Sequence, residues 1–110
     1  LAAGLLTGKY QGGAVPKGSR MERMPTLNNR VSATCFAAVE DYMDVAFKHD
    51  LDPIHMALAW VTGRPFVTAA VFGARTPDQL IRILEGLETR LTDDVLEDIE
   101  LVHQDHPAPY

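Results

Sequence analysis

Apolar residues recur along the chain at the three- and four-residue spacing of helices that are buried on one side. In the first such stretch, Phe36, Val39, Met43 and Phe47 form a stripe, and most acidic residues fall off it. The same reading along the whole chain predicts four helices, near residues 34–48, 53–62, 77–87 and 93–104.

Residues at the helix starts agree with these positions. Asp52 can cap the second helix, and Pro53 suits its first turn. Thr76, with Gln79 three residues on, has the spacing of a capping box at the start of the third helix. The fourth starts at Thr92, with acidic residues next to it, where the helix dipole favours negative charge.

The second helix carries apolar residues on most of its sides, and we expect it to be largely buried together with its Trp60 side chain. The expected inward-facing residues of the last two helices are Leu80, Ile83, Leu84 and Leu87, and Val95, Leu96, Ile99 and Val102.

One segment has the pattern of a strand. Residues 66–72, Phe-Val-Thr-Ala-Ala-Val-Phe, form a short apolar run rich in β-branched residues, which is typical of a strand covered on both faces, near 67–71. A lone parallel strand needs partners on both sides for its backbone groups. We therefore expect residues 1–110 to be part of a larger α/β domain, and the apolar run that begins at Leu1 also favours a longer chain.

The composition is that of a folded globular protein, and together with the charge it argues against two classes of function. Hydrophobic residues make up 46% of the chain, which argues against disorder. The net charge of −5 argues against a nucleic-acid-binding surface, which needs clustered cations, and the apolar runs are too short to span a bilayer. Cys35 has no second cysteine to pair with, so we expect a reducing, cytoplasmic setting.

The turn between the expected strand and the third helix is a candidate for chemistry. Gly73 would let a ligand approach the backbone, and Arg75 offers a planar cation suited to phosphate. Free amides at the start of the helix also favour an anion. A phosphate-binding site is one interpretation, and an ordinary turn with Arg75 in solvent is the other.

A second candidate lies within the first 20 residues. Residues 1–10 read Leu-Ala-Ala-Gly-Leu-Leu-Thr-Gly-Lys-Tyr, and a long loop over 11–30 contains Pro-Lys-Gly-Ser-Arg at 16–20. Thr7, Lys9 and Arg20 offer donors to phosphate oxygens, although the glycine spacing is not that of a P-loop. Taken alone, this segment reads more simply as a basic, flexible surface loop.

Together these motifs resemble the aldo-keto reductase family over essentially all 110 residues. The first ten residues, the Pro-x-Gly-Ser-Arg loop, Ala-Leu-Ala-Trp-Val at 57–61 and Gly-Ala-Arg-Thr at 73–76 followed by Gln-Leu occur there in this order and spacing. Residues 91–104, with the Pro-Ala-Pro ending, are similar to the Tas-like branch related to potassium-channel β subunits. The resemblance implies a (β/α)8 barrel that transfers hydride from NADPH to a carbonyl. Residues 1–110 would be its C-terminal segment, mostly helical with one core strand.

The resemblance also implies a role for particular residues. Lys9 and Arg20 would close over the cofactor from the long loop, and Gly73, Arg75 and Gln79 would hold the adenosine 2′-phosphate. Arg82 and Ile83 stand where the family often has Glu-Asn near the adenine, which makes Arg82 a candidate to stack on the base. The residues expected to line the pyrophosphate are Leu1, Ala2, Gly4, Leu5 and Thr7.

No catalytic residue is assigned to this chain, because the family's Asp, Tyr, Lys and His precede the matching segment. None of Tyr10, Tyr42, Tyr110, Lys48 or the four histidines corresponds to them. His103 and His106 are spaced to share a helical face, but no third metal ligand accompanies them. Cys35 lacks a neighbouring cationic motif and is interpreted as a packing residue.

Two functions stay open at this point. The first is the cofactor-binding segment of an NADPH-dependent enzyme that reduces aldehydes and ketones, inactive when separated from the rest of the enzyme. The second is a non-catalytic helical interaction or regulatory module, or the product of a truncated gene. The coding sequence upstream of Leu1 distinguishes them, since roughly 200 further residues would complete a barrel of typical size.

Overall fold

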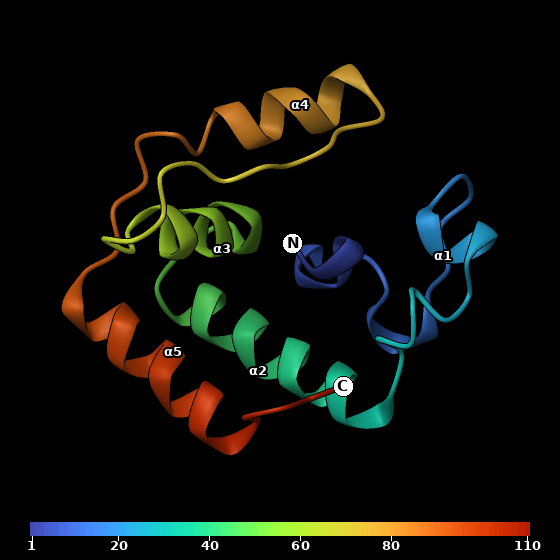
Figure 1. The fold of residues 1–110 in the computed structure, drawn as a ribbon, viewed down its shortest axis with the longest axis horizontal. Helices are drawn as coiled ribbons and strands as arrows, with labels where there is room; N and C mark the ends of the chain where they lie inside the picture. The colour runs from blue at the N-terminus through green and yellow to red at the C-terminus, as the bar shows by residue number, and fades with distance from the viewer.

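The computed structural model describes residues 1–110, all of whose regular elements are helices (Figure 1). The first third of the chain forms η1 (Ala2–Thr7), η2 (Gln11–Gly13) and α1 (Arg20–Arg23). The longer helices are α2 (Ala33–Lys48), α3 (Pro53–Thr62), α4 (Pro77–Leu84) and α5 (Asp93–Asp105). The prediction of four helices is confirmed, except that α4 ends at Leu84 rather than near residue 87.

The capping residues read from the sequence perform their expected roles. Asp52 Oδ1 accepts a hydrogen bond of 2.7 Å from the Ile54 amide at the start of α3. Thr76 Oγ1 accepts one of 3.2 Å from the Gln79 amide at the start of α4. These bonds satisfy amides that a helix start leaves without a partner in the helix, which explains why local sequence located both starts.

Helix α2 is the centre of the molecule, with η1, α3 and α5 packed against it (Figure 1). One buried cluster joins α2, α3 and α5 and consists of Val45, Ala46, Met56, Val95 and Ile99. A second cluster fastens the N-terminal segments to α2 and consists of Leu5, Tyr10, Met21, Leu27, Cys35 and Val39. The positions of η1 and of the loop after it are therefore determined by burial against α2.

The segment over residues 11–30 is more firmly held than a flexible surface loop. Met21 and Leu27 insert into the core next to Tyr10, which is completely buried. The Tyr10 hydroxyl accepts a hydrogen bond of 3.3 Å from the Met21 amide. This anchoring keeps the Pro-Lys-Gly-Ser-Arg motif at a defined place.

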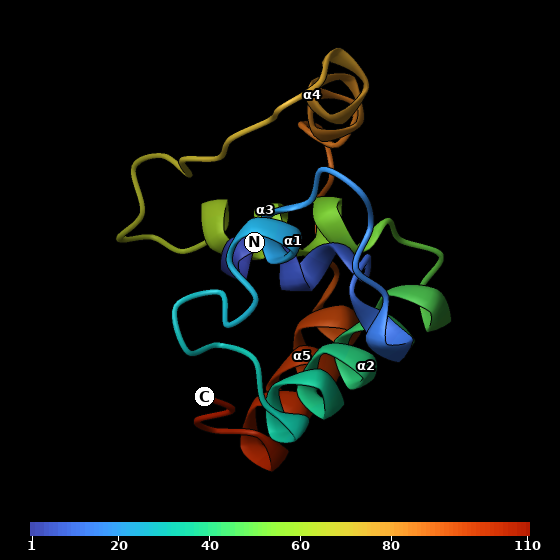
Figure 2. The same cartoon turned by 90° about the vertical axis from the view of Figure 1, so that its right-hand side faces the viewer.

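The strand expected near residues 67–71 is not formed, so that prediction was wrong for this structure. Residues 66–72 run in an extended path outside the other elements, the yellow stretch before α4 in Figure 2. Phe66 is 82% exposed and Val71 is 97% exposed. A strand is stabilised by hydrogen bonds to neighbouring strands, and residues 1–110 supply no other strand to pair with.

Several apolar side chains expected inside also lie on the surface. Phe47, the last member of the predicted α2 stripe, is 88% exposed because α3 and α5 pack on a different side of the helix. Trp60 is 38% exposed. In α4 only Ile83 is buried, while the other residues of its expected stripe are exposed: Leu80, Leu84 and Leu87. Helical spacing identifies an apolar face, but neighbouring elements decide whether that face is covered.

Candidate functional site

The N-terminal candidate segment forms a tight turn held by its own backbone. Ala2 and Ala3 have positive φ angles of 48° and 58°, and Gly4 follows with φ 98°. Thr7 Oγ1 donates a 2.7 Å hydrogen bond to the Gly4 carbonyl, and the buried Leu5 side chain anchors the turn in the core. Non-glycine residues in this conformation are strained, and such strain is found preferentially at ligand-binding turns.

Lys9 folds back over this turn. A Cβ placed on Gly4 would lie 3.1 Å from Lys9 Cε and 3.2 Å from Lys9 Nζ, so a side chain at position 4 would displace the ammonium group. Lys9 Nζ also lies 5.1 Å from the centroid of the Tyr10 ring, within range of a cation–π interaction. Lys9 and Gly4, two residues expected at the pyrophosphate, are thus neighbours.

Arg75 reaches the long loop at Gly18. A Cβ placed on Gly18 would lie 3.6 Å from Arg75 Nη1, and Gly18 has a φ of 76° that favours glycine. The Arg75 amide donates a 2.9 Å hydrogen bond to Gln79 Oε1, which links two more of the expected residues. The two motifs that the sequence separates, residues 16–20 and 73–76, therefore meet in space.

A variant of the capping box that the sequence analysis missed, in which Glu22 bonds to the amide before the N-cap Ser19, shapes the loop at this meeting point. Ser19 Oγ accepts a 3.4 Å hydrogen bond from the Glu22 amide, and Glu22 Oε2 accepts one of 2.5 Å from the Gly18 amide. Ser followed three residues later by Glu is the signature of such a box, so the sequence contained the signal. Because Glu22 occupies the Gly18 amide, an anion here would have to be held mainly by side-chain cations.

The basic residues of the candidate site carry uncompensated charge. Of the ten Lys and Arg residues, Lys48 pairs with Asp98 and Arg82 pairs with Asp52, whereas Lys9, Lys17, Arg20 and Arg75 form no ion pair. Residues 1–32 contain five of the ten cations but only Glu22 among the 15 acids. The charge distribution in this part of an otherwise acidic chain suits an anionic ligand.

Arg82 contacts the start of α3, away from the other residues that are expected to bind the cofactor. Arg82 Nε is 2.7 Å from Asp52 Oδ2, and the Arg82 carbonyl is hydrogen-bonded to the His55 ring. Burial raises the pKa of Asp52, but hydrogen bonds from Arg82 and the Ile54 amide outweigh that effect and hold the pKa below its ordinary value. Gly73 is exposed, and open space surrounds the position that its Cβ would take.

The other titratable groups considered from the sequence have structural contacts. His106 Nε2 lies 2.6 Å from Asp41 Oδ2, which joins the end of α5 to α2. Cys35 is 3% exposed, and burial raises the pKa of its thiol, consistent with a packing residue. The Tyr10 hydroxyl is enclosed in the core. These three groups are therefore engaged in the fold, and the side chains that remain available at the candidate site are the cations Lys9, Arg20 and Arg75.

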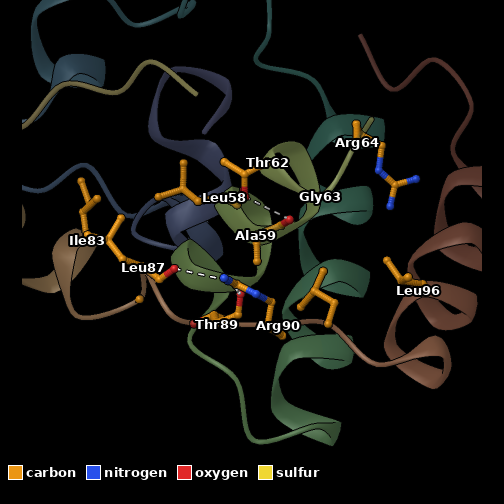
Figure 3. Close-up of a pocket in the computed structure, with 12 residues that line it drawn as sticks. Leu58, Ala59, Thr62, Gly63, Arg64, Ile83, Leu87, Thr89, Arg90 and Leu96 are labelled. Atoms are coloured by element: carbon orange, nitrogen blue, oxygen red, sulfur yellow. Dashed lines mark hydrogen bonds between the residues drawn. The ribbon is translucent and has the colours of Figure 1, made fainter. Parts of the chain in front are cut away.

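A cleft of about 560 Å³ lies elsewhere, between α3, α4 and the segment leading to α5 (Figure 3). None of the expected cofactor residues lines it. Two of its polar side chains bond to backbone carbonyls of the chain: Thr62 donates to the Leu58 carbonyl at 3.0 Å, and Arg90 donates to the Thr89 carbonyl at 3.1 Å. Most of the other side chains that line the cleft are apolar.

Comparison with known proteins gives the class to which the chain belongs. The model of the aldo/keto reductase family matches residues 1–103, so the chain belongs to this family, and the resemblance read from its motifs is confirmed. Aldo/keto reductases are oxidoreductases.

Among individual proteins, the chain is 44% identical to Protein tas of Escherichia coli (strain K12) over 111 residues, which cover 99% of this chain and 32% of that protein. It is 31% identical over 107 residues to a protein of Schizosaccharomyces pombe described as a voltage-gated potassium channel subunit beta, covering 91% and 31% of the two chains. An aldo-keto reductase of Babesia bovis is 39% identical over 83 residues, covering 73% and 29%. The chain spans about a third of the length of these curated relatives.

No helix of the structure is both long and apolar enough to cross a membrane.

Proposed function

We propose that residues 1–110 form the cofactor-binding, C-terminal segment of an NADPH-dependent aldo-keto reductase that reduces aldehydes or ketones to alcohols. The observation that carries the proposal is the approach of Arg75 to Gly18, since a Cβ on Gly18 would lie 3.6 Å from Arg75 Nη1. Two separate motifs nominated for phosphate binding converge there, and their cations are free of ion pairs.

In this proposal the residues of the chain bind and orient the cofactor. Lys9 and the turn around Gly4 face the pyrophosphate, Arg20 closes over it, and Arg75 with Gln79 holds the adenosine 2′-phosphate. When bound, NADPH supplies the hydride that a carbonyl carbon accepts. The proton for the resulting alkoxide has to come from residues outside 1–110, because this site holds no group placed to donate one. The reaction would take place in the cytoplasm, as the lone cysteine suggests.

The test is the affinity of the complete enzyme for NADPH and NADH after Arg75→Ala. The two cofactors differ by the 2′-phosphate, which a guanidinium can meet with parallel hydrogen bonds. A charge-assisted hydrogen bond contributes about 1.5–3 kcal/mol, so NADPH binding should weaken about ten- to a hundredfold while NADH binding barely changes. Arg23→Ala is a matched control, since Arg23 is an exposed arginine at the end of α1 that lies outside both motifs.

Equal changes for both cofactors, or no change for either, would show that Arg75 does not bind the phosphate. If the unaltered complete enzyme binds neither cofactor, the whole proposal is wrong. The exposed apolar residues Phe66 and Val71 then favour the alternative, an interaction or regulatory module.

A further inference from the structure

Helix α4, whose first turn carries Gln79, is held to the rest of the molecule by few contacts. It stands apart from the other helices in both views (Figures 1 and 2). Of its side chains only Ile83 is buried. Burial therefore holds α4 at a single side chain, Ile83, and specific polar contacts help to fix the orientation of the helix about that point.

Those polar contacts come from the start of α3. Arg82 Nε lies 2.7 Å from Asp52 Oδ2, while Asp52 Oδ1 accepts a 2.7 Å hydrogen bond from the Ile54 amide. Because Asp52 is fixed as the cap of α3, its carboxylate is a rigid point of attachment. One turn further along, the His55 ring bonds to the Arg82 carbonyl. We call Asp52, His55 and Arg82 the α3–α4 clasp.

We infer that the α3–α4 clasp positions the cofactor-binding end of α4, so that Asp52 and Arg82 are positioning residues for phosphate binding by Arg75 and Gln79. Gln79 lies one turn before Arg82 on the same helix and binds the Arg75 amide at 2.9 Å. A shift of α4 would therefore move Arg75 away from the loop at Gly18. This inference rests on the proposed function and names residues that need not touch the cofactor.

The competing assignment is that Arg82 itself stacks on the adenine. The two assignments differ in what they predict for Asp52. If Arg82 contacts the base, then neutralising Asp52 releases its guanidinium and leaves binding unchanged or tighter. If the clasp positions α4, then neutralising Asp52 weakens binding as much as neutralising Arg82 does.

The experiment measures the affinity of the complete enzyme for 2′,5′-ADP and for 5′-AMP with Asp52→Asn, Arg82→Met and the double variant. Asparagine is a good helix cap, so Asp52→Asn removes the charge and keeps the acceptor for the Ile54 amide. Asp98→Asn is the matched control, because it disrupts a similarly exposed ion pair, Lys48–Asp98 at 2.8 Å, on the side of α2 and α5.

Each single variant should weaken 2′,5′-ADP binding about two- to fivefold, the range of partly exposed ion pairs, and the double variant should be no weaker than either. Arg82→Lys should bind 2′,5′-ADP more tightly than Arg82→Met does. The affinity of every variant for 5′-AMP, and both affinities of Asp98→Asn, should equal those of the unaltered enzyme within error. Unchanged or tighter binding by Asp52→Asn would overturn the inference. Equal losses for both ligands would also overturn it, because that result indicates general loosening of the fold. The proposed function fails separately, if the unaltered enzyme does not bind 2′,5′-ADP.

Discussion

Replacing Gly8 by alanine tests whether the N-terminal turn is seated against α2 as the structure describes. Gly8 ends η1 with φ 75° and ψ −5°, and its amide donates a 3.0 Å hydrogen bond to the Leu5 carbonyl. A Cβ at this position would lie 2.7 Å from Met43 Sδ, closer than two non-bonded atoms of these kinds can approach. Gly8→Ala therefore adds a strained backbone and a steric clash at one place.

The size of the effect follows from these two contributions. An alanine in the left-handed region costs about 1–2 kcal/mol. Extra atoms in a packed region cost about 1–3 kcal/mol, and the lower end applies because Met43 is a flexible side chain that can move aside. We expect Gly8→Ala to lower the free energy of unfolding by roughly 2–3 kcal/mol in total.

Gly12→Ala separates the two contributions. Gly12 has φ 67°, close to the angle at Gly8, but nothing lies within 4 Å of the position its Cβ would take. Urea unfolding followed by far-UV circular dichroism should show only the backbone cost, about 1–2 kcal/mol, for Gly12→Ala. In a Met43→Ala background the cost of Gly8→Ala should fall to the same value, because the clash partner is gone.

Equal destabilisation by Gly8→Ala and Gly12→Ala would refute this reasoning. So would a cost of Gly8→Ala that does not depend on the residue at position 43. Either result would mean that η1 does not pack on α2 at Met43.

Two further predictions concern acid pH and the separate chain. The pKa values of Asp52 and Asp98 are lowered in the folded protein, so their stabilising contribution is present above about pH 4 and is lost as the pH falls through the lowered values. The urea midpoint of the unaltered protein should therefore drop in acid, and the drop should be smaller for Asp52→Asn and for Asp98→Asn. Residues 1–110 expressed alone should self-associate through exposed apolar residues such as Val71, which ultracentrifugation can check. They should not oxidise NADPH in the presence of an aldehyde, which an absorbance assay can check, and turnover by a purified monomer would contradict both expectations.

Local sequence located the helices because their starts and stops depend on near neighbours. Asp52 and Thr76 accept hydrogen bonds from amides two and three residues away, so the residues that cap α3 and α4 are adjacent to the amides they serve. The same reasoning identifies the turn of Ser19 and Glu22, which the sequence analysis overlooked. The family was also readable from sequence, because its motifs are short and ordered, and the match over residues 1–103 confirms it.

The tertiary structure alone decided what depends on distant partners. Residues 66–72 have the composition of a buried strand but stay extended and exposed, since strand pairing requires neighbours that these 110 residues do not contain. Phe47 belongs to an apolar stripe yet faces solvent, because the direction from which α3 and α5 approach is a property of the whole fold. The approach of Arg75 to Gly18 and the pairing of Arg82 with Asp52 join segments far apart in sequence. No local pattern encodes such contacts, since they arise only when packing brings the segments together.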